Sequence, residues 1–148
     1  MKIIFFIFLF LLNLHYTYSQ TGIYISATYE FTSERDITLN HIDSGSYLLT
    51  IDFDAVINKY FMWRQKGEGN EEDLFLKWAI ISKVDTKFDK QKNLVVSTYE
   101  AKFEFLGLQT DDIVYLTAID DLNDNSYNIC IYNPKYQSTS CFYKLKKI

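Results

Sequence analysis

Alternation of apolar and polar residues at every second position is the main pattern along this chain. Between Ile23 and Phe31 the odd positions are apolar or aromatic, and the even positions from 26 onward are polar. The same alternation runs through 47–54 and 95–105. Because successive side chains of a β-strand point to opposite faces, this period of two predicts strands with one buried face.

Two further segments, 113–119 and parts of 74–82, are apolar at both sets of positions, which predicts strands with little exposed surface. Short connections join neighbouring strands as antiparallel hairpins, so we expect an all-β fold. The expected topology is a single antiparallel up-and-down meander of about eight strands, and a lipocalin-like barrel is favoured over a β-sandwich. Runs of turn-forming residues separate the predicted strands, at 43–46, 65–73, 89–93, 106–112, 121–126 and around Pro134.

Segment 55–66 fits a helix and a strand equally well. Asp54 is a good helix N-cap, Gly67 is a good residue to follow a helix, and side chains between them fall at helical spacing. The run of aromatic residues within the segment instead favours a strand. Residues 33–42 are similarly undecided, so the sequence leaves both segments open.

Residues 1–19 have the three-part pattern of a secretory signal peptide. A positively charged start is followed by ten apolar residues and by a more polar stretch with small residues at positions −3 and −1 of a cut before Gln20. The apolar run is shorter than the roughly 20 residues that a membrane-spanning helix needs. We therefore expect cleavage after Ser19, one β domain over 20–148, no stable membrane insertion after cleavage, and a secreted or periplasmic location.

Composition narrows the class of protein further. Of the 148 residues 48% are apolar, which provides one core and argues against disorder. The net charge of −4, without a basic cluster away from the C-terminus, argues against a nucleic-acid binder. The bias toward Ile, Phe, Tyr, Asn and Lys is typical of an AT-rich genome, and residues 17–20 resemble signal-peptide ends that are common in bacteria.

Cys130 and Cys141 are the only cysteines, and an even count in an exported chain predicts one disulfide. If 127–132 and 139–146 pair as a hairpin, Cys130 faces Cys141 across it. A redox-active or metal-binding pair is the alternative. It is disfavoured because the chain has no Cys-x-x-Cys and because His41 is the only imidazole after the expected cleavage.

No motif in the chain predicts catalysis. Residues 121–125 resemble the opening of a calcium-binding loop, but Ser126 and Tyr132 lie where an EF-hand needs Gly and Glu. His41 adjoins no recognisable nucleophile motif. We therefore expect a protein that is not an enzyme, with no cofactor and no metal. Three carboxylates have the spacing of outward-facing strand residues: Asp52, Asp54 and Asp120.

The aromatic residues are the feature of the sequence that indicates a possible function. Side chains can fill the interior of an eight-stranded barrel, or the interior can hold one small ligand, so these rings are either core or the lining of a cavity. The candidate ligand-binding residues are Tyr60, Phe61, Trp63, Phe75, Trp78 and Phe103.

A secreted, meandering, eight-stranded chain with one disulfide resembles the lipocalin and calycin barrels in architecture. Those proteins carry Gly-x-Trp at the first strand, where this chain has Gly22-Ile23-Tyr24. The resemblance implies an extracytoplasmic, non-enzymatic binding protein that holds a small apolar ligand in its barrel. The alternative is a secreted or periplasmic protein-binding module, such as a hydrolase inhibitor, that acts through 65–73 and 121–126. A hydrolase is the third hypothesis.

Overall fold

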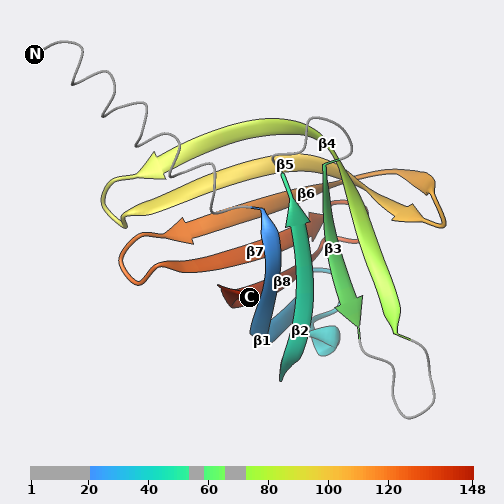
Figure 1. Ribbon diagram of the computed structural model, residues 1–148. Coiled ribbons are helices and arrows are strands. Elements are labelled where there is room, and N and C mark those ends of the chain that lie inside the picture. The colour runs from blue at the N-terminus through green and yellow to red at the C-terminus, as the bar shows by residue number, and fades with distance from the viewer. Residues whose placement is uncertain (1–20, 54–58, 66–72) are drawn as a thin grey trace, which may run out of the picture.

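A computed structural model describes residues 21–53, 59–65 and 73–148. Eight strands form one closed antiparallel barrel, in which each strand pairs with its neighbours in sequence and the last pairs with the first (Figure 1). The all-β, up-and-down meander predicted from the sequence is therefore confirmed. The strands are β1 (Gly22–Ser33), β2 (His41–Asp52), β3 (Tyr60–Gln65), β4 (Leu74–Asp89), β5 (Leu94–Phe105), β6 (Leu108–Asp121), β7 (Ser126–Asn133) and β8 (Ser138–Lys147), and a 3-10 helix, η1 (Ile37–Leu39), lies between β1 and β2.

Both segments that the sequence left open contain strand. The aromatic run of the first segment forms β3, so β propensity prevails there over the helix signals, while 54–58 and 66–72 lie outside the described residues. The second segment holds η1, which is capped by the Asp36 carboxylate where it accepts from the Thr38 N–H at 3.0 Å. No helix among the described residues is long and apolar enough to cross a membrane.

The barrel interior is filled by side chains from alternate positions of each strand, as a period of two predicts. A barrel of eight strands is narrow enough for its own side chains to occupy the space inside. The core therefore lies within the barrel rather than between two sheets. The large apolar residues of its middle are all less than 2% exposed: Phe61, Phe142, Leu49, Ile51, Leu116 and Ile129.

The prediction of which β1 residues face the barrel interior is wrong over the first half of the strand. Tyr24 and Ser26 are buried, whereas Ile23 is 45% exposed. The pairing of β1 with β2 is irregular between Ser26 and Thr28, as at a β-bulge, and beyond that point Tyr29 is again among the buried residues. A reading of strict alternation does not detect a bulge, so it assigns the wrong face on one side of it.

The expectation of little exposed surface on 113–119 is also wrong. Its inner positions are buried, and Leu116 is 0% exposed, but Ile113 and Tyr115 on the outer face are 39% and 37% exposed. A sheet that closes on itself buries only its inner face, so apolar residues on the outer face stay in contact with water.

The predicted turn at 106–112 is shorter than expected. Only Leu106 and Gly107 separate β5 from β6, and their φ angles are 50° and 81°. Positive φ at both central residues is the geometry of a tight two-residue hairpin turn. The residues from Leu108 onward belong to β6, which makes the β5–β6 hairpin long.

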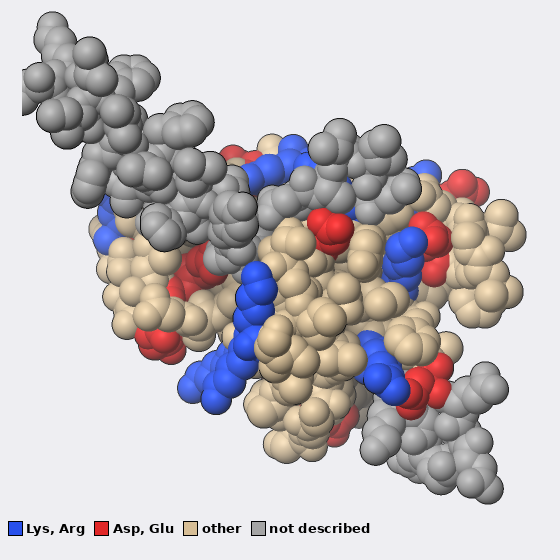
Figure 2. Space-filling model, viewed as in Figure 1, with Lys and Arg blue, Asp and Glu red and all other residues tan. Residues whose placement is uncertain are grey.

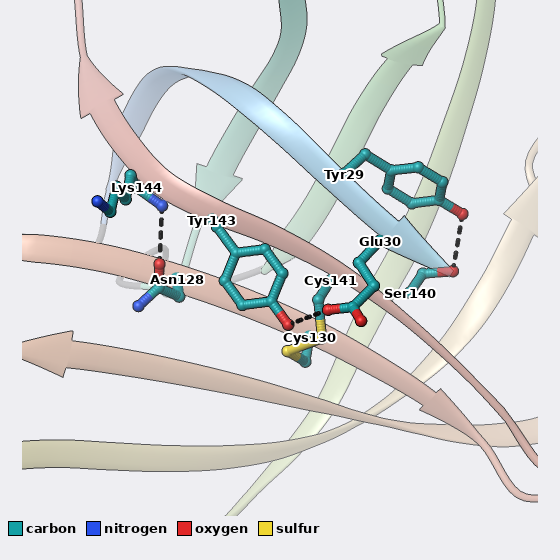
Figure 3. The surroundings of a disulfide bond; sticks show 8 residues. All are labelled: Tyr29, Glu30, Asn128, Cys130, Ser140, Cys141, Tyr143 and Lys144. Atoms are coloured by element: carbon teal, nitrogen blue, oxygen red, sulfur yellow. Dashed lines mark hydrogen bonds between the residues drawn. A yellow bond between two sulfur atoms is a disulfide. The ribbon is translucent and has the colours of Figure 1, made fainter. Parts of the chain in front are cut away.

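The predicted disulfide between Cys130 and Cys141 is confirmed. The two residues face each other across the β7–β8 hairpin, with their Cα atoms 4.1 Å apart, which is typical of a closely spaced, non-hydrogen-bonded pair. Beside the bond, the Tyr143 hydroxyl donates to Glu30 Oε2 at 2.6 Å (Figure 3). A structural disulfide is consistent with an oxidising, extracytoplasmic location.

Candidate functional site

One end of the barrel carries the connections β1–β2, β3–β4, β5–β6 and β7–β8, because consecutive strands are antiparallel. We call it the η1 end. Hydrogen bonds join two of these connections: the Glu34 N–H donates to the Gln137 carbonyl at 2.9 Å, and Arg35 Nε donates to Gln137 Oε1 at 3.2 Å. The interior near this end is the candidate functional site.

Aromatic rings pack against one another inside the barrel toward the η1 end. The centroid of the Tyr29 ring lies 5.1 Å from the centroids of both Trp63 and Phe142, and Trp63 meets Phe142 edge-on at 5.0 Å. Tilted and edge-on contacts of this kind stabilise aromatic clusters beyond simple burial. We call this set the ring cluster, and its members are Tyr29, Phe31, His41, Tyr47, Trp63 and Phe142.

A carboxylate borders the ring cluster, and two members of the cluster are neutral phenols. The Tyr29 hydroxyl lies 3.2 Å from Ser140 Oγ. Burial raises the pKa of Tyr29, and the Asp43 carboxylate raises that pKa further; the same two causes raise the pKa of Tyr47. Both phenols therefore stay protonated at neutral pH, and a carboxylate-bearing molecule at this place is repelled by Asp43.

His41 lies at the rim of the ring cluster, where its ring stacks on Phe31 at a centroid distance of 5.5 Å. His41 Nδ1 donates to the Leu39 carbonyl at 2.8 Å, because a carbonyl oxygen can only accept. Its Nε2 lies 3.5 Å from Asp43 Oδ2. The polar contacts of His41 are therefore with a backbone carbonyl and a carboxylate.

Trp63 brings a buried hydrogen-bond donor to the ring cluster. The residue is 9% exposed, and its Nε1–H is buried without a hydrogen-bond partner among the described residues. A buried donor without an acceptor destabilises a protein by roughly 1–3 kcal/mol. An acceptor atom on a bound molecule would remove that destabilisation, so Trp63 is a candidate contact for a ligand.

Four of the six residues predicted to bind a ligand come together inside the barrel. Phe61 pairs with Trp78 across β3 and β4, and their ring centroids are 5.5 Å apart. Trp78 also contacts Phe103 of β5 at 5.5 Å. Trp63, two residues after Phe61, faces the interior nearer the η1 end. Phe61 and Trp63 belong to the buried core, Trp78 is partly buried against it, and Phe103 is partly buried beside Trp78.

The other two predicted residues, Tyr60 and Phe75, lie on the outer face of the barrel. Lys77 Nζ lies 5.4 Å from the centre of the Tyr60 ring, and the Arg64 guanidinium lies 5.7 Å from the centre of the Phe75 ring. Phe75 is 51% exposed. Each of these two rings directly precedes an inward-facing residue in its strand, so period two turns it to the outside.

Sequence reasoning missed most of the ring cluster. Tyr29 and Tyr47 were on predicted inner faces, but neither was linked to Trp63. The residues come from strands that are far apart in sequence, and no local pattern shows which inward-facing rings lie at the same level of a barrel. The alternation along β1 and β2 was the only sequence signal for these rings. It indicates which side chains face inward, but the strand register is needed to show which of them lie at the same level of the barrel.

Two loops, 65–73 and 121–126, were predicted to bind a protein partner. Most of 65–73 lies outside the described residues. The turn at 121–126 is polar: Asp121 Oδ1 accepts from the Asn123 N–H at 2.9 Å, and Asp124 Oδ1 accepts from the Ser126 N–H at 2.9 Å. Both carboxylates thus hold the turn itself. In the described ranges, no three His, Cys, Asp or Glu side chains gather as a potential metal site.

The fold and the ring cluster define the class: a small, closed, eight-stranded up-and-down β-barrel with an aromatic cluster toward one end. Comparisons of the chain with protein-family models, curated proteins and solved structures gave no match. The function therefore has to be inferred from the chain's own geometry.

Proposed function

We propose that this protein is a non-enzymatic binding protein that holds a small, apolar, uncharged ligand against the ring cluster. The observation that carries the proposal is the buried Trp63 Nε1–H, which has no acceptor among the described residues. Apolar ring surface combined with a few well-placed polar groups is typical of small-molecule sites. Asp43 disfavours an anionic ligand, so the acceptor that Trp63 requires belongs to a neutral group such as a ketone, ester or ether.

The proposed ligand approaches from the η1 end. The middle of the barrel is closed by side chains such as Phe61 and Phe142, which are fully buried. Phe31 and Tyr47 are only partly buried, and the Tyr47 ring meets Trp63 edge-on at 6.3 Å. A change in the Tyr47 rotamer would open a path to the indole, and partly exposed side chains make such changes rapidly.

The proposed location is extracytoplasmic, either secreted or periplasmic. Two features support it: the signal-peptide pattern of residues 1–19, and the disulfide of the β7–β8 hairpin. The alternative function, protein binding through 65–73 and 121–126, has no comparable support, because the described turn at 121–126 is polar and uses its carboxylates internally.

Titration with Prodan, a neutral naphthyl ketone fluorophore, tests the ligand proposal. We expect saturable binding with a blue shift of the probe emission, and binding about tenfold weaker by Trp63→Phe, because this variant keeps an aromatic ring but loses the donor. Trp78→Phe is the matched control, since it removes an interior indole outside the ring cluster, and it should bind like the wild type. Lack of saturable binding by the wild type, or equal affinity of Trp63→Phe and the wild type, would overturn the proposal.

A further inference from the structure

Large apolar side chains are exposed on each connection of the η1 end for which residues are described. They lie on η1, at the start of β4, at the β5–β6 turn and at the β7–β8 turn. Isolated exposed apolar residues are ordinary, and what distinguishes these residues is the position they share, at one end of the barrel. Representative members, each between 47% and 87% exposed, are Ile37, Leu74, Phe75, Leu106, Leu108 and Tyr136.

Leu106 is the most exposed large apolar residue of the described chain, at 87%. It also has a φ of 50°, in the left-handed region, which is unfavourable by about 1–2 kcal/mol for residues other than Gly. Tight hairpin turns usually place Asn, Asp or Gly there. Leu106 therefore helps neither the turn nor the core, and this combination points to a role in contact with another surface.

The outer end of the β5–β6 hairpin carries no charge. No charged residue occurs between Phe105 and Thr110, and Figure 2 shows this end as a tan lobe at the right of the view. Of the acidic residues that follow, Asp112 is paired with Lys135 Nζ at 2.8 Å, whereas Asp111 is exposed.

The charged groups of the described η1 end include six acidic and three basic residues. The acidic residues are Glu34, Asp36, Asp43, Asp73, Asp111 and Asp112, and the basic residues are Arg35, Arg64 and Lys135. Such an end is repelled by an anionic surface and is compatible with a neutral one. The proposed contact surface therefore combines exposed apolar side chains on the connections with an excess of acidic residues around them.

We propose that the η1 end docks onto a net-neutral lipid surface, with Leu106 and Leu108 inserted among the lipid chains. The exposed residues lie on separate, projecting connections rather than on one continuous face. A bilayer accommodates separate apolar tips, whereas a protein interface requires close shape complementarity over a continuous patch. The absence of charge at the β5–β6 tip and the acidic surrounding together select a neutral lipid rather than an anionic one.

Tyr136 fits the same surface. It is 55% exposed at the β7–β8 turn, and Lys135 Nζ lies 5.5 Å from the centre of its ring. Tyrosine rings favour the boundary between lipid headgroups and acyl chains, because one end is apolar and the other is polar.

Docking at the η1 end would also bring lipid-soluble molecules close to the ring cluster. The docking proposal does not depend on the ligand proposal.

Co-sedimentation with phosphatidylcholine vesicles tests the docking proposal. We expect the wild type to bind, and Leu106→Asp/Leu108→Asp to bind at least about tenfold more weakly, because the two leucines proposed to insert among the lipid chains become carboxylates. Val84→Asp/Phe88→Asp is the matched control: these β4 residues are 54% and 52% exposed and lie toward the opposite end of the barrel. It should bind like the wild type. Far-UV circular dichroism establishes that all variants are folded.

Three results separate the outcomes. Failure of the wild type to bind phosphatidylcholine vesicles, or equal binding by the Leu106/Leu108 variant, would overturn the proposal. Stronger binding to vesicles that contain phosphatidylglycerol would contradict the neutral surface. Trp63→Phe should keep full vesicle binding, so that loss of ligand binding and loss of docking are distinguished.

Discussion

At the residue scale, single hydroxyl groups hold the irregular part of the barrel in place. Ser26 is fully buried, and its Oγ lies 2.8 Å from the carbonyl oxygens of both Thr28 and Tyr143. It also accepts from the Thr28 N–H at 3.3 Å. A bulge leaves backbone groups that the regular ladder cannot pair, and this hydroxyl supplies partners for them.

Replacing Ser26 with Ala should lower the free energy of unfolding by roughly 1–3 kcal/mol, because the buried backbone groups lose their partner. Urea denaturation measures the change. Ser44→Ala, at an exposed position of β2, is the control and should stay within about 0.5 kcal/mol of the wild type. If Ser26→Ala unfolds at the same urea concentration as the wild type, the hydroxyl does not support the bulge.

Tyr143 should make stability fall at alkaline pH. Burial, together with the hydrogen bond to Glu30, raises the pKa of Tyr143 to about 12. The unfolded chain has a tyrosine pKa of about 10, so the stabilisation is fully present below pH about 10 and is lost as pH rises to about 12. Urea unfolding across this range should show a steeper loss for the wild type than for Tyr143→Phe. Tyr29 and Tyr47, whose pKa values are also raised, affect both proteins alike, and parallel pH profiles would contradict the prediction.

At the scale of elements, the β7–β8 hairpin determines whether the barrel closes. β8 pairs with β7 on one side and with β1 on the other, so it joins the two ends of the chain. The disulfide between Cys130 and Cys141 spans a sequence separation of 11 within this hairpin. It therefore restrains the strand that would otherwise fray from the C-terminus.

Reduction of the disulfide should lower the free energy of unfolding by roughly 2–3 kcal/mol, as expected for closure of so short a loop. The measurement is urea denaturation with and without dithiothreitol. Cys130→Ser/Cys141→Ser is the control, and its stability should match the reduced wild type and not respond to the reductant. Equal stability of the oxidised and reduced wild type would show that the bond does not stabilise the hairpin.

The β5–β6 turn should be stabilised by a residue that tolerates the left-handed region. We expect Leu106→Asn to raise the free energy of unfolding by about 1 kcal/mol, measured in urea, because Asn adopts this conformation readily. Leu108→Asn should bring no such gain, since Leu108 lies within β6. If Leu106→Asn is more stable than the wild type and also binds vesicles more weakly, then Leu106 serves contact with lipid at the expense of the turn. No gain would mean that the turn is not strained.

At the scale of the whole molecule, closure of the barrel explains both what is buried and what is exposed. A closed sheet has no edge strands, so eight strands can form a stable unit without a second layer. The same closure leaves outer apolar residues such as Ile113 and Tyr115 in contact with water. The interior is aromatic and filled, which confines the proposed ligand to one end.

Mass spectrometry of the protein recovered from outside the cytoplasm tests export and oxidation together. We expect a mass equal to residues 20–148 less two hydrogens, because the signal peptide is removed and Cys130 is joined to Cys141. The same sample after reduction is the control and should gain two hydrogens. A mass that includes residues 1–19 would contradict cleavage.

The sequence by itself predicted most of the strands, the up-and-down order and the disulfide, because each depends on neighbours along the chain, but it left β3 open between strand and helix. Period two identified inner positions such as Leu49 and Ile51, and short turns implied hairpins, which placed Cys130 opposite Cys141. Trp63 was named only as one of the aromatic residues that could line the interior of a barrel.

Only the tertiary structure decided which rings meet. Tyr29 lies beside Trp63 and Phe142 because of how β1 registers with β2 and β8, and β8 is more than a hundred residues away in sequence. The bulge near Ser26 changes the inward-facing positions of β1 and cannot be detected from alternation. Strand register and bulges set the level and face of each side chain in a barrel, and both result from pairing between distant segments rather than from local pattern.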